Sequence, residues 1–254
     1  MRFIARIVVV LSILLFASPV FAASESSRGQ IPEKDGIFDD PDHPGLKVRV
    51  FVHKERPQTD ASAVLVCNLA DSDSAAVVGP TGWHLPANWT YNLNPGTAPS
   101  SVGAANLPAI AANSFNTWQS AIFGKVAFSP GANTTVSKSA YDGKNVIAWG
   151  RINRSALAIT YTRYYTSTGN VVDQDTIFNK GFAWSWSNSN TCADTNSYDV
   201  QNILTHEVGH WMGLNDHYDA TYANNTMFGY GSKGEVKKNT LTSGDISGVS
   251  AIYP

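Results

Sequence analysis

One short stretch of this 254-residue chain carries residues whose types and spacing suit metal chemistry. His206 and His210 are four residues apart, so on a helix both imidazoles leave the same face, one turn apart. Two neutral imidazoles at that separation can hold one Zn²⁺ ion. Glu207 directly follows the first histidine, so it can stand beside the metal without binding it, where a general base for water must be. The pattern predicts a catalytic zinc site; the alternative is a surface helix that carries two histidines by chance.

The residues after this helix offer a third ligand. Gly213 lets the chain leave the helix in a left-handed turn, which can bring residue 216 or 217 back to the same metal. The spacing favours Asp216, and His217 stays the alternative because a one-residue change in the loop would present it instead. If Asp216 binds, the metal centre carries one less positive charge than a three-histidine site. We then expect a bound water that is somewhat harder to ionise.

The pattern His-Glu-x-x-His-x-x-Gly-x-x-Asp resembles the long motif of the metzincin zinc endopeptidases. Its aspartate, where most metzincins have histidine, is similar to that of small secreted bacterial proteases of the snapalysin type. The resemblance covers residues 83–254 and implies an α+β fold: a twisted mixed sheet, a long helix (residues 106–123 have its apolar spacing), an active-site zinc helix and a C-terminal closing helix. Thr242 and Asp245 resemble a capping box at the start of that closing helix, which is similar to the one in matrixins.

The resemblance also implies roles for residues beyond the third ligand. Metzincins carry a methionine in a tight turn below the metal, and Met227 is the only methionine downstream of Asp216. It is expected to pack under the histidine ligands, an ordinary core methionine being the alternative. Tyr230 could reach the metal site and stabilise the oxyanion, or it could be a core or cleft tyrosine.

Two further expectations concern a calcium site and the edge that binds the substrate. Asp173 and Asp175 could help to form a calcium site, as acidic loops do in matrixins, although solvated or hydrogen-bonded acids are the simpler interpretation. Metzincins bind a peptide substrate as an extra strand on the sheet edge nearest the metal. By order in the chain, residues 157–160 are our candidate for that edge.

The start of the chain is typical of an exported protein. Residues 1–22 are predicted to be a signal peptide, because Arg2 and Arg6 precede a short apolar run and small residues precede a cleavage point after Ala22. The apolar run is too short to span a bilayer, so the mature chain is expected to be secreted or periplasmic, without a membrane anchor. Loss of both arginines shifts the net charge from −2 to −4, and without a basic run nucleic acid is not an expected partner. A protein or peptide substrate and a monomeric chain are expected instead.

The rest divides into a front segment and a catalytic domain. Residues 23–82 are predicted to be a leader or pro-segment, and residues 83–254 the catalytic domain. Within the front segment, the alternation of Val48, Val50 and Val52 predicts a strand. The sequence leaves open whether this strand is removed later or extends the fold permanently.

The chain has two cysteines, Cys67 in the front segment and Cys192 in the catalytic domain. In an exported protein they are expected to form one disulfide. The alternative is that Cys67 ligates zinc in a silent precursor, as the switch cysteine of matrixin precursors does, but its neighbouring residues do not match that motif.

The sequence thus predicts a secreted zinc endopeptidase. Zn²⁺ lowers the pKa of its bound water and polarises the scissile carbonyl, while Glu207 takes the proton and passes it to the leaving amine. One rival is another zinc hydrolase with the short motif, such as an aminopeptidase, which would act on peptide ends. Gly213, Asp216 and Met227 argue against it. The other rival is a non-catalytic binding protein on the same scaffold, which failure to bind zinc would favour.

Overall fold

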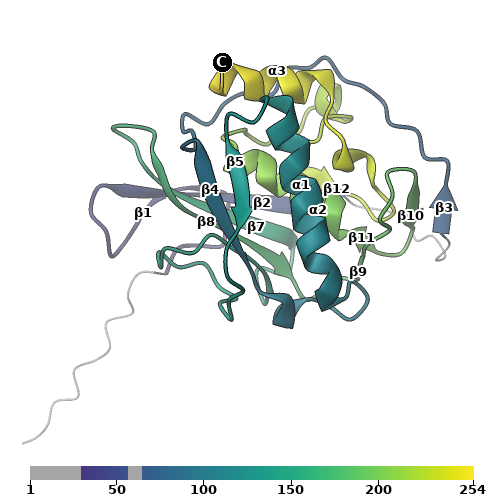
Figure 1. Cartoon of the computed structure of the whole chain (residues 1–254), viewed down its shortest axis with the longest axis horizontal. Helices are drawn as coiled ribbons and strands as arrows, with labels where there is room; N and C mark the ends of the chain where they lie inside the picture. Colours follow the sequence, from purple (N-terminus) through teal and green to yellow (C-terminus); the bar gives the residue numbers. More distant parts are fainter. Residues whose placement is uncertain (1–29, 57–64) are drawn as a thin grey trace, which may run out of the picture.

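A mixed eight-stranded sheet forms the centre of the computed structural model, which describes residues 30–56 and 65–254 (Figure 1). Residues 1–22, the predicted signal peptide, lie outside the described residues. The sheet strands follow in the spatial order β1 (Gly36–Asp39), β2 (Leu46–Glu55), β7 (Ala156–Tyr165), β8 (Val171–Asn179), β6 (Val146–Gly150), β4 (Asn88–Leu93) and β5 (Ala127–Pro130), with β12 (Tyr230–Gly231) beside β2. Two small pairs lie apart from it: β3 (Leu65–Cys67) with β10 (Cys192–Asp194), and β9 (Trp184–Ser185) with β11 (Tyr198–Asp199).

Strand β2 comes from the predicted front segment, yet it lies inside the sheet. It pairs antiparallel with β7 along almost its whole length and parallel with β12 near its end. On its other side, β7 pairs with β8. Residues 157–160, the predicted substrate edge, are therefore not open in this structure, because β2 covers that side of β7.

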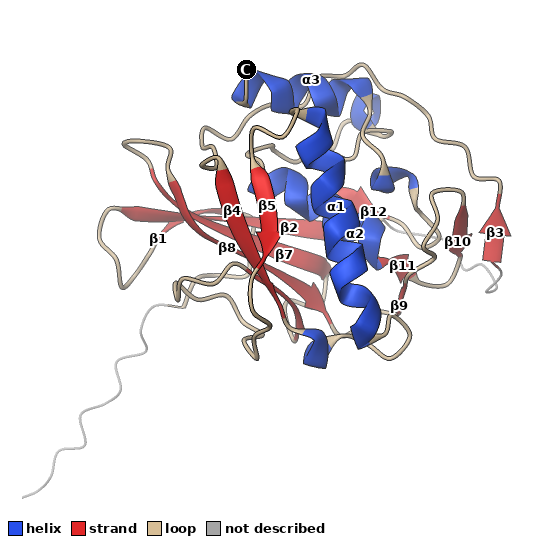
Figure 2. Cartoon of the chain, viewed as in Figure 1, coloured by secondary structure: helices blue, strands red, loops and turns tan. Residues whose placement is uncertain are grey.

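Helices pack on one face of the sheet (Figure 2). The α-helices are α1 (Leu107–Ala121), α2 (Val200–Trp211) and α3 (Ser243–Ile252), and single 3₁₀ turns occur at Pro95–Thr97, Ala104–Asn106, Ala220–Tyr222 and Lys237–Asn239. Helix α1 buries one stripe of residues at helical spacing: Leu107, Ile110, Ala111, Ser114, Phe115 and Trp118. The Trp118 indole N–H donates to the Thr205 carbonyl at 2.7 Å and so joins α1 to α2. This α+β arrangement confirms the predicted fold class.

Helix α3 closes the fold as the sequence predicts. Its cap residue Thr242 accepts from the Asp245 N–H, and the Asp245 carboxylate accepts from the Thr242 N–H, which confirms the capping box. The apolar side of α3 adds Val249 to the main core. Within residues 30–56 and 65–254, no helix has both the length and the apolar character needed to cross a bilayer.

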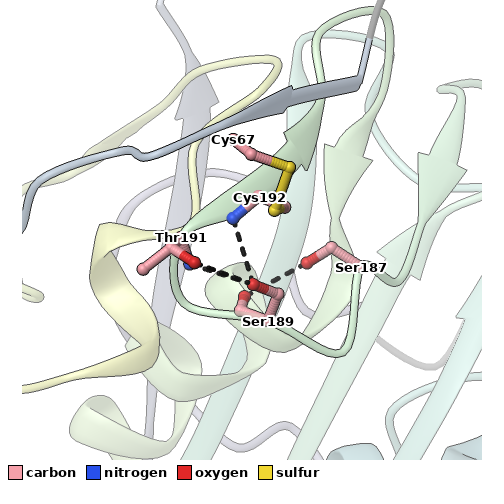
Figure 3. Close-up of a disulfide and its surroundings, with 5 residues drawn as sticks. All are labelled: Cys67, Ser187, Ser189, Thr191 and Cys192. Atoms are coloured by element: carbon pink, nitrogen blue, oxygen red, sulfur yellow. Dashed lines mark hydrogen bonds between the residues drawn. A yellow bond between two sulfur atoms is a disulfide. The ribbon is translucent and has the colours of Figure 1, made fainter.

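A disulfide joins Cys67 in β3 to Cys192 in β10, where the two residues are register partners (Figure 3). The Ser189 hydroxyl accepts from the N–H groups of Thr191 and Cys192, both at 3.0 Å, which shapes the loop beside the bond. Since the Cys67 sulfur is bonded to Cys192, it is not available as a metal ligand. The front segment is thereby linked covalently to the loop that precedes α2.

Candidate metal centre

Helix α2 presents two histidines to one point in the interior. The chain enters the helix from extended residues of β11, and the Asp199 carboxylate caps it by accepting from the Asn202 N–H at 3.0 Å. His206 Nδ1 lies 2.7 Å from the Thr226 carbonyl, and His210 Nδ1 lies 2.9 Å from the Leu214 carbonyl. Each Nδ1 therefore carries the proton and donates to a backbone oxygen. This fixes the tautomer and leaves both Nε2 atoms with free lone pairs, as in metal-binding histidines.

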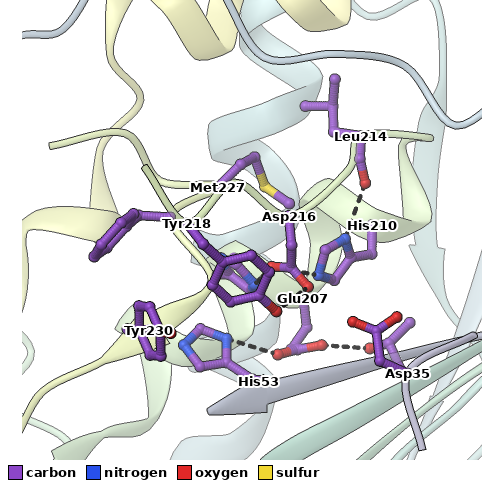
Figure 4. A network of polar contacts seen from close by, with 12 residues as sticks. Asp35, His53, Glu207, His210, Leu214, Asp216, Tyr218, Met227 and Tyr230 are labelled. Atoms are coloured by element: carbon purple, nitrogen blue, oxygen red, sulfur yellow. Dashed lines mark hydrogen bonds and ion pairs between the residues drawn. The ribbon is translucent and has the colours of Figure 1, made fainter. Parts of the chain in front are cut away.

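The turn after α2 brings Asp216 to these two nitrogens (Figure 4). Gly213 has φ +96°, and a Cβ there would lie 2.6 Å from the Trp83 carbonyl, so only glycine fits this turn. Asp216 Oδ1 lies 3.1 Å from His206 Nε2 and 3.4 Å from His210 Nε2. His217 points elsewhere, because its Nε2 accepts from the Gly79 N–H at 3.0 Å. The structure thus brings together His206, His210 and Asp216, and not His217.

The three converging atoms fit one zinc ion. Ligand atoms about 2.0–2.1 Å from a tetrahedral metal lie about 3.3 Å from each other, and the separations from Asp216 Oδ1 are 3.1 and 3.4 Å. His206 Nε2, His210 Nε2 and Asp216 Oδ1 are all buried, and none has a hydrogen-bond partner in the described part of the chain. Buried polar atoms without partners are rare and need an explanation. Two imidazoles and a carboxylate are a donor set typical of zinc.

The turn with Met227 packs against α2 beside this cluster. A Cβ at Gly209 would overlap Met227 Sδ and lie 2.8 Å from Trp118 Cζ2, so glycine at this position lets the methionine pack against the helix between the two histidines. The Asp245 carboxylate accepts from the N–H groups of Thr226, at 2.8 Å, and Met227, at 3.3 Å. The closing helix thereby holds the turn that supplies the carbonyl partner of His206.

Glu207 lies beside the cluster, and each of its two carboxylate oxygens has a side-chain partner within hydrogen-bond distance. The Thr160 hydroxyl donates to Oε2 at 2.7 Å, and His53 Nδ1 lies 3.0 Å from Oε1. The side chain is completely buried. Burial raises the pKa of Glu207 to about 7, although the Thr160 hydrogen bond lowers it. A carboxylate with that pKa can both accept and return a proton near neutral pH.

His53 is a residue that the sequence analysis missed. It comes from β2, is fully buried, and its ring meets the edge of the His206 ring at a centroid distance of 4.0 Å. Among the described residues, His53, His206 and Glu207 form a second group close enough to share a metal ion. The alternation of β2 could have indicated this position. In a strand, residues 51 and 53 must point to the face of the sheet opposite to that of Val48, Val50 and Val52.

A second residue that the sequence analysis missed, Tyr218, contacts the cluster. The Tyr218 hydroxyl lies 3.3 Å from Asp216 Oδ2. Tyr230 packs its ring against Tyr218 at a centroid distance of 5.1 Å, and its carbonyl accepts from Lys238. In an extended loop, residues two apart face the same side, so the sequence did hold a signal for Tyr218 in its spacing from Asp216.

The two acids considered for calcium have an arginine between them. Asp173 and Asp175 lie on β8, buried, and Arg163 Nη1 contacts them at 2.7 and 3.3 Å, while Arg163 Nε contacts Asp40 at 3.2 Å. Burial raises the pKa of both β8 acids. The guanidinium takes the place that a cation would need, so these carboxylates form an internal ion-pair network.

Comparison with known proteins agrees with this geometry. No curated protein matches the chain. The model of the matrixin family matches residues 82–254, which include α2, the turn with Met227 and the closing helix. Because this match covers well over half of the sequence, the chain belongs to the matrixins, a family of zinc metallopeptidases.

Proposed function

We propose that this matrixin is a zinc-dependent endopeptidase in which His206, His210 and Asp216 hold the metal and Glu207 is the general base. The observation that carries the proposal is the meeting of three buried, unpartnered ligand atoms at separations suited to one tetrahedral ion. When bound, zinc would activate water and polarise the scissile carbonyl. The family makes protein or peptide the expected substrate class.

The residues around the cluster supply the proton transfers and the orientation. Glu207 takes a proton from the attacking water and delivers it to the leaving amine, a task suited to its raised pKa. Thr160, which donates to Glu207 Oε2 at 2.7 Å, holds the carboxylate in position. Tyr218 is our candidate for a hydrogen-bond donor to the oxyanion, because its hydroxyl already lies at the cluster. Tyr230 lies behind it and is a weaker candidate.

We also propose that the chain is exported, with residues 1–22 as the signal peptide, 23–82 as the front segment and 83–254 as the catalytic domain. The Cys67–Cys192 disulfide supports this proposal, because such bonds persist in oxidising compartments outside the cytosol.

The first test measures zinc binding, a measurement that needs no substrate. Purified chain should bind one equivalent, and His206→Ala and Asp216→Ala should each weaken binding by about 100-fold or more. His217→Ala is the matched control and should bind like the parent, because its ring nitrogen accepts from the Gly79 N–H. Loss of zinc binding in His217→Ala but not in Asp216→Ala would show that the third ligand is His217 and that the assignment to Asp216 is wrong.

The second test measures cleavage with internally quenched peptides over long incubations. Glu207→Gln should retain zinc and lose at least about 1,000-fold in rate, since it keeps its shape but cannot accept a proton. Glu33→Gln serves as control, because that carboxylate bonds the backbone N–H of Asn153, away from the cluster. Undiminished cleavage by Glu207→Gln refutes the mechanism. Release of terminal residues alone would instead indicate an aminopeptidase.

A further inference from the structure

Strand β2 is bound on both sides directly beside the metal cluster. It runs antiparallel to β7 and then parallel to β12, and its register with β7 shifts between His53 and Lys54. The Lys54 N–H donates to the Gly229 carbonyl at 3.3 Å, and the Arg56 N–H donates to the Gly231 carbonyl at 2.8 Å. Without β2, β7 would be the open edge next to Glu207. An extended peptide binds to such an edge by adding a strand.

The side chains of β2 that face α2 close the access to the cluster. The Phe51 ring stacks on the His210 ring at a centroid distance of 3.7 Å. Figure 4 shows His53 Nδ1 in contact with the Glu207 carboxylate, at 3.0 Å. His206, Glu207 and His210 have no exposed surface. A polypeptide substrate therefore cannot reach these residues while β2 is in place.

The His53 ring fills a recess built by three elements of the catalytic domain. His206 of α2 meets the His53 ring edge-on. The Nε2 atom of His53 lies 3.4 Å from Lys238 Nζ. A Cβ at Gly231 would lie 3.0 Å from the same Nε2, so glycine in β12 leaves room for the ring. The recess thus lies next to the proposed general base and accepts one side chain from an extended strand, as a substrate side-chain pocket does.

Strand β2 is not part of the region that matches the family. The match begins at residue 82, whereas β2 spans Leu46–Glu55. Strand β2 nevertheless lies between β7 and β12. Its His53 fills the recess, and its Phe51 stacks on the proposed zinc ligand His210. Placement between two hydrogen-bonding strands is what a bound peptide would show.

From these contacts we propose that residues 46–56 are an internal pseudosubstrate, which occupies the peptide-binding channel and keeps the intact chain latent. The proposal rests on the proposed endopeptidase function. His53 makes the segment an inhibitor, because its Nδ1 bonds the Glu207 oxygen that would otherwise receive a proton. Displacement of β2 frees Glu207, opens the recess and exposes the β7 edge together.

The test uses Lys54→Pro in the full chain, with Lys54→Ala as the matched control. Lys54 is paired with both β7 and β12, where proline removes the N–H bond to Gly229 and does not fit the sheet. Both variants lose the ammonium group that lies 4.4 Å over the Tyr218 ring, so only the backbone differs. We expect Lys54→Pro to cleave quenched peptides about tenfold faster or more than Lys54→Ala. Lys54→Ala should stay near the parent rate.

A binding measurement separates this proposal from the endopeptidase function. A fluorescent peptide hydroxamate, which chelates zinc, should bind zinc-loaded Lys54→Pro about tenfold more tightly or better than Lys54→Ala. If the hydroxamate gains affinity but no variant cleaves peptide, the latency stands and the endopeptidase function fails. If neither rate nor affinity differs between the two folded variants, the pseudosubstrate proposal is overturned.

A second variant covers the case in which the proline chain does not fold. Phe51→Ala/His53→Ala keeps the backbone ladder and removes the two side chains that face α2, so it should raise hydroxamate affinity and cleavage in the same direction. A decrease in both, with zinc content unchanged, would show that these residues support the site and would overturn the proposal. A synthetic peptide of residues 46–56 should inhibit the activated variant competitively with substrate.

Discussion

Gly209 offers a sharp test of how the turn with Met227 supports the zinc helix. In Gly209→Ala, the new methyl would overlap Met227 Sδ and lie 2.8 Å from Trp118 Cζ2 and 3.0 Å from Met227 Cε. Carbon atoms normally keep about 3.5–4.0 Å apart, so the methionine must move. Overpacking costs about 1–3 kcal/mol, and the better helix propensity of alanine returns about 1 kcal/mol. We expect a net loss of about 0–2 kcal/mol in unfolding free energy.

The cause can be isolated with a double-mutant cycle. Met227→Ala alone should cost about 2–5 kcal/mol, because it leaves a cavity under α2. In Gly209→Ala/Met227→Ala the new methyl lies in that cavity, so the double variant should be more stable than the sum of the single effects by about 1–2 kcal/mol.

Urea unfolding of the zinc-free and zinc-loaded chains measures both stability and metal affinity. Gly209→Ala should also weaken zinc binding, since Gly209 lies between His206 and His210 on α2. Strictly additive free energies in the cycle, together with full zinc affinity in Gly209→Ala, would refute the packing argument. Ala112→Gly on α1, at a half-buried position inside that helix, is a control for helix propensity away from the zinc helix.

Two further predictions follow from contacts near and far from the cluster. Tyr218→Phe should lower kcat about tenfold or more with little change in KM, whereas Tyr230→Phe should change kcat less than about twofold, as steady-state assays of an activated chain would show; equal effects would remove the Tyr218 role. Arg163→Met should cost about 3–5 kcal/mol near neutral pH, because it leaves buried carboxylates unpaired. Burial raises the pKa of Asp173 and Asp175 when folded, so the folded chain binds protons more readily than the unfolded chain. Arg163 lowers both pKa values and its loss raises them further, so the deficit should shrink as pH falls towards about 6, the pKa of Asp175 in the folded parent chain. Urea titrations measure this, and a deficit that stays constant as pH falls to about 6 would contradict this account.

The sequence predicted what depends on local spacing. The four-residue separation of His206 and His210 placed both rings on one face of a buried helix, and the capping box located the start of α3. Spacing also favoured Asp216, whose carboxylate lies beside both imidazoles; its ligand role stays a prediction. These features follow from helix geometry and turn chemistry, which a few neighbouring residues determine.

The sequence could not predict which strands pair. The alternating valines of β2 indicated a strand but not its neighbour, because backbone hydrogen bonds are the same for every partner. The position of His53 beside Glu207, 154 residues away in the chain, depends on that pairing. The same limit applies to Arg163, since nothing in its local sequence shows that it meets Asp40 across the fold.

The disulfide has a consequence for how fully β2 occupies the channel. Strand β2 ends at Glu55, and soon afterwards in the chain the disulfide joins Cys67 to Cys192, in the segment before α2. The disulfide therefore holds the strand near its site by a short covalent connection, and the effective local concentration of the strand is on the order of millimolar. Dilution cannot lower that concentration, and a substrate at micromolar concentration competes poorly with it. The tether thus turns a modest strand interaction into occupancy that does not depend on how much protein is present.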